Sequence, residues 1–314
     1  MNMTPYANSL FEQPWWLDIV APGRWEESVV RDSDGEVIAR MPYVISRRWY
    51  GNTITMPPAT QTLGPWFSDR AIKPGNSQFS CQKELISELL GNIPKSVWFL
   101  LSMHNANTYV LPYRWHGFQL IPSFSYRIDD LTDLDKVYER FHKSVKKNIR
   151  RSENTSIISN EADPELLHRM IEITFQYQNR RPHESKEFVT RIVNTCEASG
   201  HGRMFVARDI DGNVQVAAYM VYDENTAYAL MSGSDPRFRS SCAKTRIYWE
   251  QIQYAAKVSK IFDFEGSMVQ GIENIVRQFG GYQAINYAIM RGWLPFEMAY
   301  LAKPRVKRLL GYKI

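Results

Sequence analysis

The sequence lacks the features that mark several classes of protein. Its 314 residues include only three cysteines, Cys81, Cys196 and Cys242, too widely spaced for a disulfide framework or a Cys-x-x-Cys metal pair. This usage fits a reducing compartment, so we expect a cytoplasmic protein. No apolar run approaches the ~18 residues of a membrane-spanning helix. The first residues, MNMTPYANSLFEQPWW, lack the basic and apolar regions of a signal peptide.

Signatures of several enzyme classes are missing as well. The six histidines are scattered and make no HExxH or other metal-ligand spacing. The sequence has no P-loop for a nucleoside triphosphate and no G-x-S-x-G turn for a serine nucleophile. We therefore predict chemistry that needs no bound metal.

What is present indicates a folded and mildly basic protein. With 44% hydrophobic and 23% charged residues the chain can bury a full core, and its length suggests two modest domains. A net charge of +5 permits an anionic partner without requiring one. Aromatic residues make up 13% of the chain, which suits either packed cores or the walls of a substrate groove.

Strand and helix patterns alternate along the chain, which predicts a mixed α/β fold. Hairpins are expected at Asp34-Gly35 and Asp211-Gly212, because Asp-Gly tolerates a positive φ. The helix expected over 134–151 has the clearest apolar face. The other helices are expected at about 78–90, 164–178, 187–198, 243–258 and 272–279, and the later strands at 97–103, 203–208, 214–222, 226–232, 261–265 and 284–290.

Two parts of the sequence resemble each other in the same order. Residues 31–37 (RDSDGEV) return 177 residues later as RDIDGNV. Residues 97–103 and 114–117 correspond to 260–266 and 277–280, both 163 residues later. An ordered series of matches indicates a duplicated domain. We expect one copy over 1–125 and the other over 126–314, with extra basic and paired helices only in the second.

The segment FDFEGS at 262–267 carries two carboxylates. On a strand, Asp263 and Glu265 would share one face and the two phenylalanines the other. Burial and mutual repulsion would raise a carboxylate pKa, which suits a general base near neutral pH. The first copy has Leu100 and Ser102 at the corresponding positions, so we expect chemistry only in the second. The alternatives are an edge strand with a solvated acidic face, or a carboxylate that simply caps a backbone group or pairs with an arginine.

The helix expected over 134–151 also carries a positive stripe. Its basic residues recur every three or four positions: Lys136, Arg140, Lys143, Lys147 and Arg150. Such a stripe suits the phosphates of a nucleotide-activated sugar, a lipid carrier or tRNA, and the alternative is a solvated helix face. Arg181, in a loop between helices, is a further candidate for substrate contact. The basic tail 303–310 is a candidate for peripheral contact with an anionic membrane.

Taken together, these motifs resemble the FemAB-like branch of the GNAT acyltransferase superfamily. The similarity is carried by FDFEGS at 262–267, GIE at 271–273, VRQFGG at 276–281, KKNIRRSE at 146–153 and PPATQTLGPW at 57–66. It spans nearly the whole chain and is clearest over 143–290. The resemblance implies two tandem GNAT-like domains, in agreement with the internal repeat.

The resemblance also implies an activity. Proteins of this superfamily move an acyl group from acyl-CoA, commonly acetyl-CoA, to a primary amine. In this branch the expected acceptor is an amino sugar, nucleotide-sugar or lipid-linked precursor of the cell envelope or a surface polysaccharide. One alternative is a Fem-type transferase that uses aminoacyl-tRNA, and another is a non-catalytic module that binds an anionic glycan or nucleic acid.

By the same resemblance, particular residues receive roles. Glu265 or Asp263 would be the general base, and Ser232 and Gly233 would end a strand whose N–H groups face the acyl carbonyl. The phosphates of the donor would meet a turn and helix start formed by Arg237, Arg239, Ser241, Cys242, Ala243 and Lys244. Substrate contacts are expected from Lys147, Arg150, Arg181 and Trp66.

The turn before Lys244 departs from the pattern of the superfamily. Ordinary members have glycine where this chain has Cys242, and a Cβ there would crowd the phosphates. Nearby arginines and Lys244 would compensate with charge. The alternative for this segment is an ordinary helix start in which Ser240 or Ser241 is the N-cap.

Overall fold

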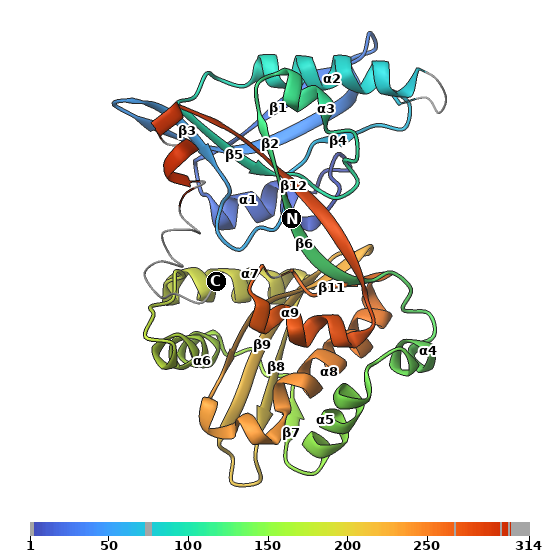
Figure 1. Ribbon diagram of the computed structural model, residues 1–314, viewed down its shortest axis with the longest axis vertical. Coiled ribbons are helices and arrows are strands. Elements are labelled where there is room, and N and C mark those ends of the chain that lie inside the picture. The colour runs from blue at the N-terminus through green and yellow to red at the C-terminus, as the bar shows by residue number, and fades with distance from the viewer. Residues whose placement is uncertain (1–2, 73–76, 267, 296, 301, 303–314) are drawn as a thin grey trace. The chain divides into compact units, whose positions relative to one another are not determined.

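The computed structural model describes residues 3–72, 77–266, 268–295, 297–300 and 302 (Figure 1). The chain forms two compact units, one from Met1–Phe124 and Ile285–Ile314 and the other from Ser125–Ala284. The chain therefore changes unit twice, at 124/125 and again at 284/285. Ser267 of the FDFEGS motif and the basic tail 303–310 lie outside the described residues.

The first unit is an antiparallel meander with a fourth strand added in parallel. Its strand order is β1-β2-β3-β5-β12, and β4 pairs with β2. The strands are β1 (Trp25–Arg31), β2 (Val37–Arg48), β3 (Gly51–Thr55), β4 (Trp66–Phe67), β5 (Trp98–Ser102) and β12 (Tyr282–Gly292). The helices are η1 (Leu10–Glu12), α1 (Pro14–Val20), α2 (Gln78–Asn92) and α3 (Leu111–Trp115).

The second unit repeats this arrangement. Its strand order is β7-β8-β9-β10-β11-β6, again an antiparallel meander followed by a parallel strand. The strands are β6 (Gln119–Ile128), β7 (Ile157–Ser159), β8 (Gly202–Arg208), β9 (Val214–Tyr222), β10 (Thr226–Ser234) and β11 (Ile261–Asp263). The helices are α4 (Leu134–Glu139), α5 (Lys143–Glu153), α6 (Pro164–Tyr177), α7 (Lys186–Ser199), η2 (Pro236–Ser241), α8 (Ala243–Val258), α9 (Gln270–Val276) and η3 (Arg277–Phe279).

The two predicted hairpins have the same hydrogen bonds. Asp32 Oδ1 accepts from the backbone N–H groups two and four residues later, and Asp209 Oδ1 does the same in the second unit. Gly35 and Gly212 both have φ of 84°, a left-handed conformation that glycine adopts without strain. The repeat read from the sequence therefore corresponds to a repeat of structure.

The last strand of each repeat pairs in the sheet of the other repeat. β6 follows α3 in the first copy but pairs with β11, in register Phe262↔Ile128. β12 follows η3 in the second copy but pairs with β5, in register Ile289↔Leu101. This exchange explains why the chain changes unit twice.

Helices cover both faces of the sheet in the second unit (Figure 1). Val216, Ala218 and Met220 of β9 alternate toward the core shared with α5 and α8. Tyr219, between them, points the other way and donates to the carbonyl of Val193 in α7. Alternate side chains on a strand point to opposite faces, so β9 is buried on both. No helix in the described ranges is long and apolar enough to cross a membrane.

The single helix expected over 134–151 is wrong, because two helices occupy this stretch. α4 ends at Glu139 and α5 begins at Lys143, and His142 between them has an extended conformation. The His142 N–H donates to the carbonyl of Gln278 rather than to the preceding helical turn. The apolar face is nevertheless confirmed, since Val137, Phe141, Val145 and Ile149 are all buried.

Candidate active site

The neighbouring strands β10 and β11 part in the middle of the second unit. They pair in parallel from Thr226↔Ile261 to Tyr228↔Asp263, where β11 ends. β10 continues to Ser234, and its pairing with β9 shifts register between Tyr228 and Met231. Beyond Tyr228, β10 has no further pairing with the described residues of β11. Backbone N–H and C=O groups on that edge are therefore available to a ligand.

Asp263 closes β11 and is held in place by its surroundings. The side chain is 2% exposed. Its Oδ1 accepts from the Ser125 hydroxyl and, at 2.7 Å, from the Glu265 N–H, while Oδ2 lies 3.8 Å from Arg127 Nε. A carboxylate with these partners anchors the turn that follows the strand.

Glu265 has a different environment two residues later. Its backbone has φ of 61°, a left-handed conformation that is strained for a residue with a side chain. The residue as a whole is half-buried, but Oε1 is enclosed and has no hydrogen-bond partner among the described residues. Burial, and secondly the charge of Asp263, raise the pKa of this carboxyl well above its ordinary value.

The predicted strand over 261–265 is therefore wrong at its end. Glu265 lies outside β11, and the rings of Phe262 and Phe264 pack against each other with centroids 4.9 Å apart. The side chains of Asp263 and Glu265 consequently do not lie on one face of a strand. Asp263 is the anchored member of the pair, and Glu265 is the member with an unused oxygen.

The turn before α8 uses much of its hydrogen-bonding capacity internally. Ser241 Oγ donates to the Phe238 carbonyl and accepts from the Ala243 N–H at 3.2 Å. Cys242 has φ of 62°, so it takes the left-handed conformation for which glycine is the usual choice. Its Sγ lies 3.5 Å from Asn148 Oδ1 of α5. Ser241 therefore takes part in the helix start, but Ser240 or Ser241 as the N-cap is wrong, because the N-cap residue is Cys242.

The cations near this turn differ in their availability. Arg237 is engaged with the buried Asp235, at 2.6 Å, and Arg239 stacks over the ring of Tyr177 at 5.6 Å. On α5, Lys147 and Arg150 are exposed and take part in none of the ion pairs within the described ranges. α5 contacts both α8 and η2, so its cations belong to the same region as the turn.

Other predicted site residues lie elsewhere. Arg181 lines an open hollow at the α6–α7 loop, together with residues of both charges, among them Glu172 and Lys186. Trp66 belongs to the first unit, where its ring packs 5.2 Å from that of Tyr6. Gly233 is required by packing, because a Cβ there would come within 2.1 Å of the Met170 backbone in α6.

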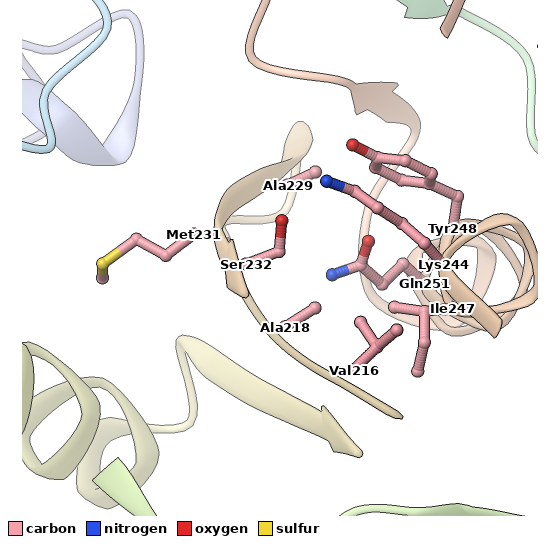
Figure 2. A pocket seen from close by; sticks show the side chains of 9 residues that line it. All are labelled: Val216, Ala218, Ala229, Met231, Ser232, Lys244, Ile247, Tyr248 and Gln251. Atoms are coloured by element: carbon pink, nitrogen blue, oxygen red, sulfur yellow. The ribbon is translucent and has the colours of Figure 1, made fainter. Parts of the chain in front are cut away.

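A pocket lies between the sheet and the first half of α8 (Figure 2). β9 and β10 contribute one wall, and Lys244, Ile247, Tyr248 and Gln251 of α8 contribute the other. Figure 2 shows the Ser232 hydroxyl, the Lys244 ammonium group and the Gln251 amide directed toward the same space. The pocket thus combines an apolar floor with a few polar groups, but its volume of about 10 Å³ holds little more than one water molecule.

Sequence reasoning identified Ser232 and Lys244 but missed Tyr248 and Gln251. In the sequence Tyr248 continues an ordinary amphipathic helix and cannot be told from a core residue. The only trace of Gln251 is that a polar residue falls within the apolar series of Ile247, Ile252 and Ala255, and this pattern alone does not indicate a site.

Comparison with known proteins agrees with this geometry. Residues 139–266 match the family model of the acetyltransferase (GNAT) domain. The matched range ends one residue after Glu265 and therefore includes β10, α8 and β11. None of the curated proteins matches the chain in sequence.

Solved structures share the fold over nearly the whole chain. A crystal structure of FemX superposes with a TM-score of 0.66 at 11% identity, covering 94% of this chain and 95% of that one. L-PGS from Bacillus licheniformis gives 0.54 at 11% identity, with 95% and 92% covered. A conserved protein of unknown function from Bacteroides thetaiotaomicron gives 0.55 at 12% identity, with 92% and 93% covered. The chain therefore has the Fem-like fold of two tandem GNAT-like domains, and its residues 139–266 are similar to a GNAT acetyltransferase domain.

Proposed function

We propose that this transferase is a cytoplasmic N-acyltransferase that uses acyl-CoA, with acetyl-CoA as the first donor to test. Its acceptor would be a primary amine on a cell-envelope or surface-polysaccharide precursor. The observation that carries the proposal is Glu265, a carboxyl with an enclosed oxygen that has no partner in the described part of the chain, beside the point where β10 and β11 part. It lies in the segment that matches the acetyltransferase family.

Glu265 suits the proton transfer that this reaction requires. An amine attacks only after it loses its extra proton. The raised pKa of the Glu265 carboxyl lies closer to the pKa of the ammonium group than that of an ordinary carboxyl does, which favours the transfer of this proton to Glu265. The arriving ammonium group would first draw the carboxyl into its ionised form, because an opposite charge lowers a carboxyl pKa. Glu265 would then take one proton from the ammonium group, which leaves a neutral amine that attacks the thioester carbonyl. An amide forms, the C–S bond breaks, and the second proton that the nitrogen loses passes to the leaving thiolate.

Other groups of this chain would position the donor. The unpaired edge of β10 beyond Tyr228 offers backbone N–H groups for the developing oxyanion. Phosphates would meet Lys147, Arg150, Arg239 and Lys244 rather than a bare backbone cradle, because the Ala243 N–H is already bonded to Ser241. Arg237 contributes less, since Asp235 neutralises it. Arg181 and Trp66 remain proposed acceptor contacts.

The proposal is tested by direct transfer assays. Purified protein is incubated with radiolabelled acetyl-CoA and a panel of amino sugars, free and nucleotide-linked, and product amide is measured. We expect transfer by the wild type and a loss of about 10²–10⁴-fold in kcat for Glu265→Gln. Full activity in Glu265→Gln would show that the base is a different group. Binding of an anionic glycan without transfer from any donor would instead favour a non-catalytic module.

The exposed cations of α5 favour a second candidate, an aminoacyl-tRNA donor. Lys147 and Arg150 are free of ion pairs within the described ranges and would suit a polyanion longer than CoA. A domain described as part of a lysylphosphatidylglycerol synthetase from Agrobacterium fabrum has a similar fold, with a TM-score of 0.50. A charged tRNA that raises the melting temperature where acetyl-CoA does not would favour this donor.

A further inference from the structure

Five large apolar side chains are exposed in two short segments of the first unit. One segment is the tip of the hairpin between β2 and β3, and the other follows the end of β12. Trp49 is 96% exposed and Trp293 is 70% exposed, although tryptophan is highly buried on average. We call this set the apolar end: Trp49, Tyr50, Trp293, Leu294 and Met298.

Main-chain contacts bring the two segments to the same end of the sheet. The order β2-β3-β5-β12 and the register of each pair place the end of β2, the starts of β3 and β5 and the end of β12 side by side. The Val97 N–H donates to the Asn52 carbonyl at 2.9 Å, and the Trp293 N–H donates to the Val97 carbonyl at 3.0 Å. Tyr300 packs its ring 5.5 Å from that of Trp98 in β5. Figure 1 shows the red segment after β12 beside β3.

Basic side chains border the apolar end. Arg48 directly precedes the hairpin tip, and Lys95 lies beside β3, where its carbonyl accepts from the Asn52 amide at 3.0 Å. Both cations are exposed and belong to none of the ion pairs found in the described chain. Arg47 adds less positive charge, because Glu26 lies 2.5 Å from it.

The chain that follows the apolar end is also basic. Glu297 is half-buried and engaged internally, since its carboxyl oxygens accept from the Gly292 N–H at 2.7 Å and from the Gln119 amide at 2.9 Å. Residues 303–314, which lie outside the described ranges, contain five basic residues and no acidic residue in the sequence. Positive charge therefore accompanies the exposed apolar side chains in both the structure and the sequence.

We propose that the apolar end docks on an anionic membrane surface. Tryptophan and tyrosine are enriched at the boundary between lipid and water, and basic residues beside them attract anionic head groups. A polyanion in water is bound by cations and stacked rings, and it would leave Leu294 and Met298 exposed. The inference holds whatever the donor of the transferase is, and it would place the protein at the surface where a lipid-linked acceptor lies.

The apolar contribution is tested by co-sedimentation with vesicles. The vesicles contain phosphatidylcholine alone or phosphatidylcholine with about 30% phosphatidylglycerol. The variant is Trp49→Ala combined with Trp293→Ala. Its control is Ile210→Ala, which removes an exposed apolar side chain at the hairpin tip of the second unit. Melting temperatures show whether each variant is folded.

The contribution of charge is tested in the same assay. The variant is Arg48→Gln combined with Lys95→Gln. Its control is Lys83→Gln combined with Lys257→Gln, which changes the net charge equally at exposed positions of α2 and α8. Binding is measured at two ionic strengths, because salt screens the attraction between exposed charges.

We expect the wild type to bind the anionic vesicles about tenfold or more tightly than the neutral ones. The double tryptophan variant should lose about tenfold or more in affinity, and Arg48→Gln with Lys95→Gln about fivefold or more, while both controls bind as the wild type does. No binding by the wild type, or unchanged binding by the folded tryptophan variant, would overturn the inference. Self-association without vesicle binding that the tryptophan variant abolishes would assign the apolar end to a second copy of the chain and would overturn it as well.

Discussion

The parallel strands β5 and β11 occupy the same place in the two repeats but end differently. β5 pairs with β12 over five residues, from Gly292↔Trp98 to Ala288↔Ser102. β11 stops after three residues, and the chain turns away at Glu265 with a left-handed backbone. Ser102 therefore sits in a regular ladder, whereas its counterpart Glu265 lies in a turn, and one of its carboxyl oxygens is unpaired as far as the structure is described. One scaffold can thus carry a site in one copy and an ordinary sheet in the other.

The largest effect is expected when Asp263, which anchors the turn after β11, loses its side chain. Asp263→Ala would leave the largely buried Arg127 without its nearest charge and Ser125 without its acceptor. We expect a loss of about 3–5 kcal/mol in the free energy of unfolding, measured with urea. Leu100→Ala, at the corresponding position of the first repeat, should cost less because that side chain is only half-buried. Equal losses would mean that Asp263 is not a special anchor.

The next prediction concerns pH and Glu265. A carboxyl whose pKa is raised on folding stabilises the fold below its unfolded pKa, and this contribution is lost as pH rises toward the folded value. Each unit of the rise corresponds to about 1.4 kcal/mol. Glu265→Gln should therefore be more stable than the wild type at pH 8–9, with the difference vanishing near pH 4. Melting curves across this range test the sign, and Ser102→Ala should show no such trend.

The two hairpins should respond alike, because their backbones and hydrogen bonds match. Gly35→Ala and Gly212→Ala place a Cβ into open space but force a residue with a side chain to φ of 84°. We expect each to cost about 1 kcal/mol. Denaturation of the two single variants gives the comparison directly. A much larger effect at one hairpin would show that the repeats have diverged there too.

The smallest effect on stability is expected on α5. Lys147→Gln and Arg150→Gln change exposed side chains without ion pairs in the described structure, so the free energy of unfolding should stay within about 0.5 kcal/mol. Affinity for the phosphate-bearing donor should nevertheless fall, and more strongly at low salt. Titrations at two ionic strengths separate these effects. Unchanged affinity for the donor would mean that the basic stripe of α5 faces solvent and does not bind the phosphates.

Much of the second unit could be predicted from its sequence. The bounds of β9 and α8 match the expected 214–222 and 243–258, because clear periodicity and turn residues mark both elements. The break between α4 and α5 could not be predicted, since the apolar spacing runs through it and the cause is a hydrogen bond to Gln278, far away in sequence. Likewise, β3 carries little alternation of its own, and its pairing with β2 decides it.

The candidate site was predicted in part for similar reasons. The carboxylates were found because they stand out in an aromatic strand, and the contrast with the first copy located them. Their difference in role could not be predicted, because it depends on Ser125 and Arg127 from a strand that begins in the other repeat. The environment of Gln251 could not be predicted, since only the tertiary structure shows that its amide is buried without a partner among the described residues.

Because the last strands are exchanged, each repeat depends on the other for one strand of its sheet. A chain cut in the loop after β6 would give one fragment that has β5 without β12 and another that has β11 without β6. Each fragment would expose an unpaired strand edge, so we expect neither half to be stable on its own. Either copy can lose its chemistry and still be retained, because each supplies the strand that completes the other.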